Sequence, residues 1–146
     1  MTVWHLRYDD PDYERKRKAE ADRLRERHPF ILSVPFDAVP LGWMTLLWRY
    51  ADAVDGLLRE HPEARYETLQ IVSPEGAFAI RFAASADINA AVGSLAHRVS
   101  AVRSQTCDMC GGEGFAIVVD GQAAVRCPED SESLGYRILW KGGGTT

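Results

Sequence analysis

Hydrophobic residues recur with helical spacing in two segments of the chain. In the first segment, 41–59, apolar residues follow one another at steps of three and four: Trp43, Leu46, Leu47, Tyr50, Val54, Leu57 and Leu58. In the second segment, 87–103, the apolar row is Ile88, Val92, Leu95, Val99 and Val102. Rows of this spacing place an apolar stripe on one side of a helix. We therefore predict two amphipathic helices, the second with Ser85 as its N-cap.

A third predicted helix, from Pro11 to about His28, is mostly polar. Asp10 or Asp12 can cap its start, where proline is also favoured, and Pro29 ends it. The following segment, 30–40, is apolar but contains two prolines. We expect it to be an extended or looping connection that packs on the core.

Alternating patterns predict two hairpins. Segments 65–72 and 77–83 flank a turn that contains Pro74 and Gly76, and segments 115–119 and 122–126 flank Asp120-Gly121. Short strands are also expected at 2–8 and 134–140. The predicted fold is α+β: a small antiparallel sheet packed on two amphipathic helices, with a C-terminal zinc-ribbon-like hairpin and a polar N-terminal helix. We expect a core at 1–105, a ribbon lobe at 106–141 and a flexible tail at 142–146.

Composition is that of an ordinary globular protein. The 146 residues are 46% hydrophobic and 26% charged. The net charge of −4 argues against a nucleic-acid-binding surface over the whole molecule and suits a basic partner. The N-terminus lacks the apolar segment of a signal peptide, and the sequence lacks a run of about 18 apolar residues. We expect a cytoplasmic protein without membrane contacts.

All three cysteines lie in one short stretch. Cys107 and Cys110 have the two-residue spacing of a metal knuckle, and Cys127 returns at the separation of a two-knuckle zinc ribbon. Asp130 stands where a fourth Cys or His would be. We predict a structural Zn²⁺ held by Cys107, Cys110, Cys127 and Asp130. The alternatives are Glu129 or His97 as fourth ligand, no fourth protein ligand, or a ribbon that has lost its metal.

The order of these features resembles a group of small uncharacterised bacterial and prophage-borne proteins. Those proteins carry a Gly-Trp helix start, a Gln-Ile strand, a Gly-containing hairpin, a long helix, Thr-Cys-x-x-Cys-Gly and a final Cys-x-x-His. The matching residues here are Gly42, Trp43, Gln70, Ile71, Gly76, Phe82, Thr106, Cys107, Cys110, Gly111, Gly114 and Cys127. The departure is Asp130 in place of His. The resemblance covers about two-thirds of the chain and implies the fold and the metal knuckle, but no activity.

Residues for catalysis are sparse, and we expect that the protein is not an enzyme. The four histidines are scattered, and neither a serine nor a cysteine sits in a nucleophile motif. A basic run in the first helix could follow phosphates: Arg15, Lys16, Arg17, Lys18, Arg23, Arg25 and Arg27. Acidic residues interleave with it and favour a solvated helix face. A nucleic-acid-associated zinc-ribbon protein is therefore the alternative function.

The leading hypothesis is a small cytosolic binding protein that occludes a partner protein, as immunity proteins and phage-encoded inhibitors do. A basic toxin or nuclease would meet acidic side chains, and complementary charge would speed association. The candidate acidic residues are Asp9, Asp10, Asp12, Glu60, Glu63 and Glu67. A structural subunit of a larger assembly is a third possibility.

Overall fold

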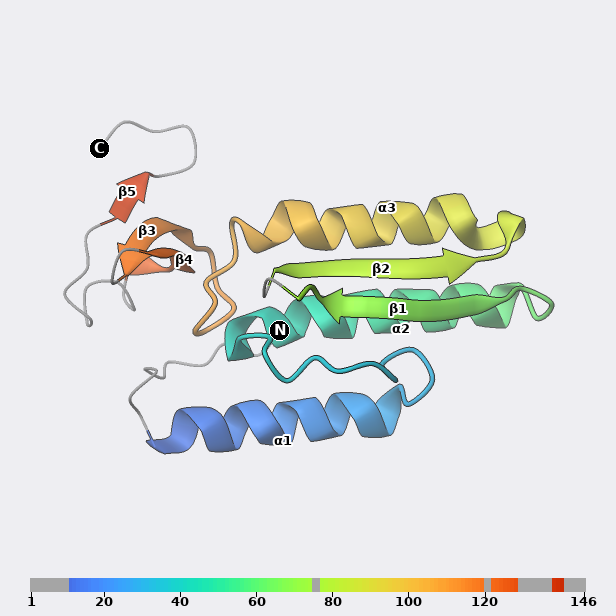
Figure 1. The fold of residues 1–146 in the computed structure, drawn as a ribbon, viewed down its shortest axis with the longest axis horizontal. Helices are drawn as coiled ribbons and strands as arrows, with labels where there is room; N and C mark the ends of the chain where they lie inside the picture. The colour runs from blue at the N-terminus through green and yellow to red at the C-terminus, as the bar shows by residue number, and fades with distance from the viewer. Residues whose placement is uncertain (1–10, 75–76, 120–121, 129–137, 141–146) are drawn as a thin grey trace.

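The computed structural model describes residues 11–74, 77–119, 122–128 and 138–140, and it confirms the α+β class (Figure 1). In chain order, the elements are α1 (Pro11–Arg27), the 3-10 helix η1 (Leu41–Trp43), α2 (Met44–Glu60), β1 (Tyr66–Val72), β2 (Phe78–Ala84), α3 (Ala86–Arg103), β3 (Phe115–Val119), β4 (Gln122–Arg126) and β5 (Ile138–Trp140). The strand expected at 2–8, the turn residues 75–76 and 120–121, and the tail lie outside the described residues. So do residues 134–137 of the last expected strand.

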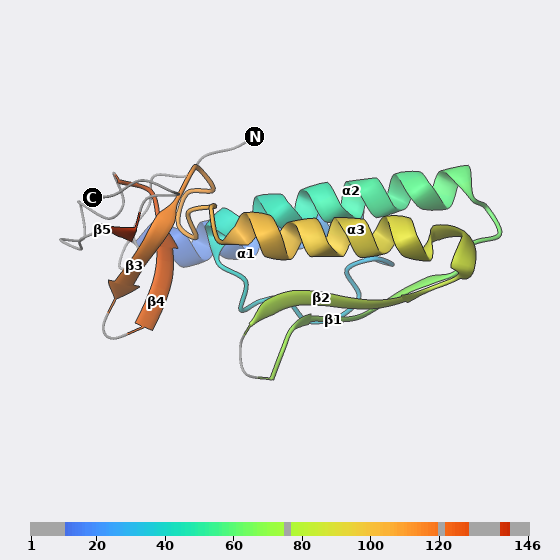
Figure 2. The ribbon, with the colours of Figure 1, turned by 90° about the horizontal axis from the view of Figure 1, so that it is seen from above.

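The core lies between two helices and a hairpin. Helices α2 and α3 run antiparallel, and the β1–β2 hairpin covers one side of the pair (Figures 1 and 2). Helix α1 packs beside α2. The predicted apolar stripes supply much of the core, because Leu46, Leu47, Tyr50 and Val54 of α2 are buried. The stripe of α3 contributes Ile88, Val92 and Val99, while Leu95 and Val102 are half-buried.

The helix expected at 41–59 begins instead as the short 3-10 turn η1, and α2 follows it. The Trp43 backbone N–H donates to Pro40 O at 3.0 Å, which closes the tight turn. The Trp43 ring stacks on Phe78 of β2, with centroids 5.7 Å apart. This turn carries the chain from the connection 28–40 into the core.

The connection itself is held by a chain of buried hydroxyl groups. Tyr50 and Tyr66 hydroxyls lie 2.6 Å apart, and the Tyr66 hydroxyl lies 2.6 Å from Thr68 Oγ1. Thr68 Oγ1 then donates to Ile31 O at 2.6 Å. Since a buried polar group without a partner is costly, this chain joins α2, β1 and the connection in one arrangement. The expectation that segment 30–40 packs on the core is confirmed by the burial of Ile31 and other apolar residues of this segment.

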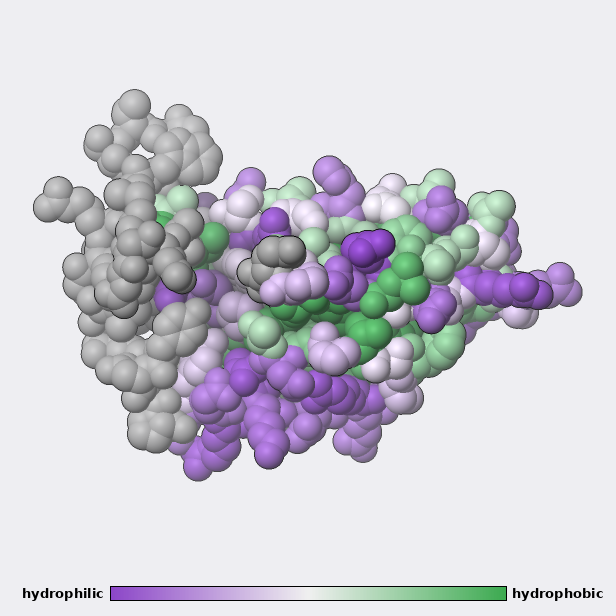
Figure 3. Space-filling view, in the orientation of Figure 1, coloured by the Kyte–Doolittle hydropathy of each residue, from purple (hydrophilic) through white to green (hydrophobic). Residues whose placement is uncertain are grey.

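Helix α1 is largely solvated, as predicted, and contributes a narrow buried row: Tyr13, Ala21 and Leu24. Two polar contacts tie it and the next residue to α2. Trp48 Nε1 donates to Glu20 Oε1 at 2.6 Å, and His28 Nε2 lies 2.6 Å from Asp52 Oδ1. The charged outer face of α1 forms the hydrophilic band at the lower edge of Figure 3.

A second sheet stands at one end of the molecule (Figure 1). Its strand order is β4–β3–β5, with β3 antiparallel to both neighbours. The hairpin predicted at 115–126 is confirmed, with Phe115 opposite Arg126 and Val119 opposite Gln122. Helix α3 leads directly into this lobe. Within the described ranges, none of the helices has the length and apolarity that a bilayer crossing requires.

Candidate metal centre

The three cysteines come from two turns of the C-terminal lobe. Cys107 and Cys110 lie in a tight turn after α3, and Cys127 directly follows β4. The turn closes through the Gly111 backbone N–H, which donates to Cys107 O at 2.9 Å. Gly111 has a φ of 82°, in the left-handed region that favours glycine. The Cys-x-x-Cys-Gly pattern therefore has a local conformational cause.

The sulfur atoms converge in space. All three Sγ atoms lie within 4.8 Å of one another, and Cys110 Sγ lies 3.6 Å from Cys127 Sγ. A tetrahedral ion with zinc–sulfur bonds of about 2.3 Å separates its sulfurs by about 3.8 Å. The three cysteines, all of which are described, are not joined by a disulfide, since the 3.6 Å separation is far longer than an S–S bond. Three buried cysteines are thus close enough to bind one metal ion.

Hydrogen bonds favour thiolates at this position. The pKa of Cys107 is lowered, chiefly by its hydrogen bond with Cys110 and also by backbone hydrogen bonds, against the opposing effect of burial. The Gly112 backbone N–H donates to Cys110 Sγ at 3.4 Å. Donors that point at sulfur stabilise its anionic form, which is the form that binds metal.

The described residues supply three ligands. Within the described part of the chain, the group of side chains close enough to hold a metal ion consists of Cys107, Cys110 and Cys127. His97 lies exposed on α3 and does not join this group. Asp130 and Glu129 lie outside the described residues, so the fourth ligand stays a prediction.

The turn that carries Cys107 and Cys110 is docked on η1, directly before α2. The Gly42 backbone N–H donates to Asp108 O at 2.9 Å, and Trp43 Nε1 donates to Thr106 O at 2.8 Å. A Cβ at Gly42 would lie only 2.1 Å from Cys107 O, so the two backbones meet where only glycine fits. The turn also shares a buried cluster with η1 and α1: Tyr13, Leu41, Cys107, Met109, Cys110 and Cys127.

A buried ion pair joins the same turn to the end of β4. Arg126 Nη1 lies 2.7 Å from Asp108 Oδ1, with side chains 1% and 8% exposed. The Asp108 backbone N–H also donates to Val125 O at 2.9 Å. These contacts join the first knuckle to the strand that carries Cys127. Sequence reasoning missed the pair, although an acid within Cys-x-x-Cys and an arginine directly before the third cysteine were visible signals.

The acidic residues proposed for partner binding do not share one surface. Asp12 lies in the first turn of α1, at the end of the molecule near the ribbon, and is paired with Arg15. Glu60 ends α2 at the opposite end, close to Glu63 and Glu67 in sequence. Asp9 and Asp10 lie outside the described residues. A partner surface made from all six acids is therefore not what the fold presents.

The basic residues of α1 are largely matched by acids on the same helix. Arg15, Arg17 and Arg23 each pair with an acid three residues earlier, and Arg25 pairs with Asp37 at 2.7 Å. The other basic residues of this helix, Lys16, Lys18 and Arg27, are exposed. Because the pairs neutralise much of the positive charge, the helix is a weak electrostatic site for phosphates.

Comparison with known proteins identified no relative: no family model, curated protein or solved structure matches the chain. The resemblance to prophage-borne proteins therefore remains a prediction.

Proposed function

We propose that this protein is a zinc-stabilised binding module that acts by covering a surface of a partner protein. The observation that carries the proposal is the outward face of α3. Its exposed residues are mostly small and uncharged: Ala86, Asn89, Ala90, Ala91, Ser94 and Ala101. The cores of protein interfaces are depleted of charged residues, so such a face suits contact with another protein.

The contrast with α1 supports this choice of face. Most residues of α1 are charged, whereas the 18 residues of α3 include only Asp87, Arg98 and Arg103 as charged side chains. Figure 3 shows the difference: the surface over α1 is strongly hydrophilic, while the upper edge over α3 is paler and mixed. The molecule thus separates a solvated side from a side fit for contact.

The proposed zinc has a structural role. Cys107, Cys110 and Cys127 are at most 9% exposed, and the turn that carries them packs against η1 and α1. When bound, zinc supplies the positive charge that keeps converging thiolates together. A site enclosed in this way stabilises the docking of the lobe, in keeping with structural zinc sites elsewhere.

Metal analysis of the purified protein tests the zinc proposal. We expect about one zinc per chain in the wild-type protein and much less in Cys107→Ser, because tight structural sites need their full thiolate set. Ser104→Ala, an exposed position just before the knuckle, is the matched control and should retain its zinc. A wild-type protein that is folded but free of bound metal, after purification without chelators, would contradict the proposal.

Partner binding is tested with the product of the neighbouring reading frame in the source genome. We expect a stable complex by calorimetry, weakened about tenfold or more by Ser94→Glu or Ala101→Glu, since each places a charge in the contact face. Lys18→Glu on the solvated side of α1 is the control and should bind normally. If that partner is a toxin or nuclease, the complex should also inhibit its activity. A wild-type protein that binds neither this product nor other proteins made by the source cell would refute the function.

The nucleic-acid alternative makes a different prediction. If Lys16, Lys18 and Arg27 contact phosphates, affinity for DNA or RNA should fall steeply with salt. The local ion pairs of α1 favour the other outcome, in which binding at low salt is negligible. Measurement of RNA and DNA affinity across a salt series separates the two functions.

A further inference from the structure

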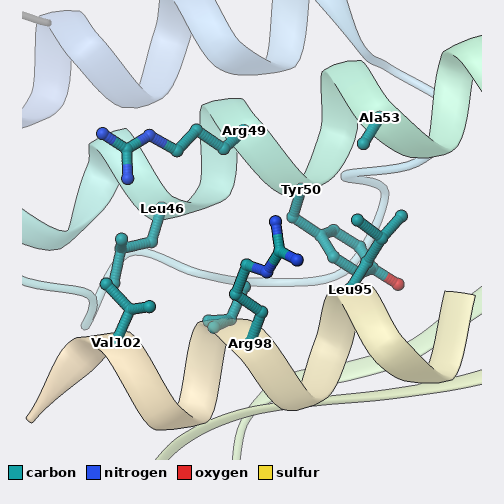
Figure 4. Close-up of a pocket in the computed structure, with 8 residues that line it drawn as sticks. Leu46, Arg49, Tyr50, Ala53, Leu95, Arg98 and Val102 are labelled. Carbon is teal, nitrogen blue, oxygen red and sulfur yellow. The ribbon is translucent and has the colours of Figure 1, made fainter.

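A groove opens along the outer edge of β1, on the side of the connection (Figure 1). Its two walls are the end of the strand, 69–72, and segment 34–38 of the connection, and its volume is about 400 Å³. The hollow between α2 and α3 in Figure 4 is different, because Leu46 and Tyr50 in its lining belong to the buried core. The groove beside β1 combines apolar surface with an open sheet edge.

Exposed apolar groups distinguish this groove from a filled seam of the core. The buried residues Phe36 and Ile71 form its floor. Leu69 at its rim is 46% exposed and is one of the two large hydrophobic side chains that are exposed among the described residues. Val34 and Val72 are half-buried in the same lining. Apolar surface is therefore left in contact with water at the edge of the sheet.

The backbone of β1 has a partner strand on one edge only. In the described part of the chain, its sheet consists of β1 and β2. Near the start of β1, the connection closes the other edge, because Thr68 Oγ1 donates to Ile31 O at 2.6 Å. Beyond that point, among the described residues, backbone hydrogen bonds do not link segment 34–38 to the strand. An open edge presents N–H and C=O groups that can pair with an added strand.

The groove leads toward the start of α1. A neighbouring hollow is lined by three residues of α1 and three of the connection: Tyr13, Glu14, Arg17, Asp37, Ala38 and Pro40. Asp37 and Ala38 line both hollows, so the two adjoin and together extend from the first turns of α1 to β1. Ten residues precede α1, which begins at Pro11. An extended segment of that length spans about 33 Å, whereas the wall 69–72 is about 10 Å long.

The sequence before α1 has the pattern that an added strand requires. Alternation predicts a strand at 2–8, and in a strand alternate side chains point to opposite sides. One side of this strand is an apolar row: Trp4, Leu6 and Tyr8. The other side contains the polar residues His5 and Arg7. Such a segment can place one side on an apolar floor and keep the other in water.

From these features, we infer that segment 2–8 binds in the groove as a third strand beside β1, with its apolar row toward the floor. The bound segment covers Leu69 and pairs the open backbone edge. It thereby closes this edge to extended segments of other chains, the contact through which exposed edge strands aggregate. The inference is independent of the proposed function, which concerns the outward face of α3.

Hydrogen exchange of the full-length protein tests for the added strand. We expect alternate amides of 3–8 to exchange at least about tenfold more slowly than those of an unstructured segment, because pairing with β1 protects them. Leu69→Lys should remove this protection, since the apolar contact would then desolvate a charge. Ala83→Lys introduces the same residue at an exposed position of β2 outside the groove. This matched control should keep the protection, and circular dichroism confirms that both variants are folded.

Photo-crosslinking locates the segment in the full-length protein. Benzoylphenylalanine in place of Leu6 should form cross-links within one chain to the walls of the groove, 34–38 or 69–72, identified by mass spectrometry. The same group in place of Asn89, which is exposed on α3, is the control and should not reach these walls.

Exchange of amides 3–8 at the rate of an unstructured segment would overturn the inference. Full protection of these amides in Leu69→Lys, or cross-links from position 6 that avoid both walls, would also overturn it. A mixture of isotope-labelled and unlabelled protein reveals cross-links between chains. If those predominate, the inference is wrong and a second copy of the chain occupies the groove.

Discussion

At the scale of single residues, the cysteine cluster is braced by buried charged groups that are paired across two segments of the chain. Asp108 and Arg126 are both nearly inaccessible to solvent, and each belongs to a segment that presents a cysteine. The desolvation of two charges offsets much of their attraction, so the pair is weak evidence for net stability. Removal of one partner is different, because the remaining buried charge loses the opposite charge that lies 2.7 Å away.

A double-mutant cycle measures this coupling. Arg126→Met should lower the free energy of unfolding by about 3–5 kcal/mol, because the buried Asp108 carboxylate loses the guanidinium that lies 2.7 Å away. Asp108→Asn combined with Arg126→Met should be less destabilised than the sum of the single variants, by about 1–3 kcal/mol. Urea unfolding of the four proteins gives the values. Simple additivity would show that the two side chains are not coupled.

Tyr13 makes the stability sensitive to alkaline pH. Burial raises its pKa from 10.0 to about 12, against the opposing effect of the hydrogen bond from the Leu41 backbone N–H. The folded state therefore resists ionisation of Tyr13. Its contribution is complete below pH 10 and is lost as the pH rises toward 12, at about 1.4 kcal/mol per pH unit.

Tyr13→Phe tests whether ionisation of Tyr13 lowers the stability at alkaline pH. It should cost about 1 kcal/mol at pH 8 through loss of the hydrogen bond to Leu41. Between pH 10 and 12, its stability should fall less steeply than that of the wild-type protein. Tyr50 and Tyr66, whose pKa values are also raised by burial, retain their share of the pH dependence. Parallel pH profiles for the two proteins would exclude a role for Tyr13.

At the scale of elements, the lobe is positioned by backbone contact rather than by a broad apolar surface. Gly42 of η1 packs against Cys107 O and Gly111 N, and its own N–H donates to Asp108 O. Backbone atoms of the cysteine turn occupy the space that a side chain at position 42 would need. The contact between the turn and η1 therefore tolerates only glycine at this position. The short 3-10 turn before α2 is the element that makes this approach.

Two glycine substitutions separate this contact from general helix effects. Gly42→Ala should destabilise the protein by about 3 kcal/mol or more, since its Cβ would lie 2.1 Å from Cys107 O. Gly56→Ala is the matched control within α2, where a Cβ would meet nothing within 4 Å. We expect Gly56→Ala to stabilise by about 0.5–1 kcal/mol through helix propensity. Thermal unfolding measures the stability of both variants. Small changes in stability of similar size for Gly42→Ala and Gly56→Ala would refute the tight contact at Gly42.

At the scale of the whole molecule, two buried clusters organise the structure. The larger one joins α1, α2, α3, the hairpin and the connection, and it contains none of the cysteines. The smaller one holds all three cysteines with Tyr13, Leu41 and Met109. The core should therefore stay folded without metal, while the cysteine cluster should not.

Hydrogen exchange after chelation tests this division. With a chelator, amides of 106–126 and η1 should exchange at least about tenfold faster, because chelation removes the proposed zinc from the three thiolates. Amides of β1, β2 and the middle of α3 should keep their protection. The same treatment of Cys107→Ser should change little. Uniform loss of protection across the chain would show that the two clusters unfold as one.

The sequence by itself determined most of the elements of this protein and the residue types of its cysteine cluster. The patterns that led to these predictions are all local. They are the helical periodicity at 41–59 and 87–103, the alternation around Asp120-Gly121, and the spacing of Cys107 and Cys110. Local patterns reflect propensities and short-range geometry, which a sequence displays directly. The exception within these elements is η1, where contact with the distant cysteine turn accompanies a 3-10 turn in place of the helix start.

Only the tertiary structure decided which distant residues meet. It paired Asp108 with Arg126, brought Gly42 against Cys107, and separated Asp12 from Glu60. Each of these relations depends on how the helices and hairpins pack against one another. Packing orientation arises from the fit of many side chains together, and no spacing along the chain encodes it by itself.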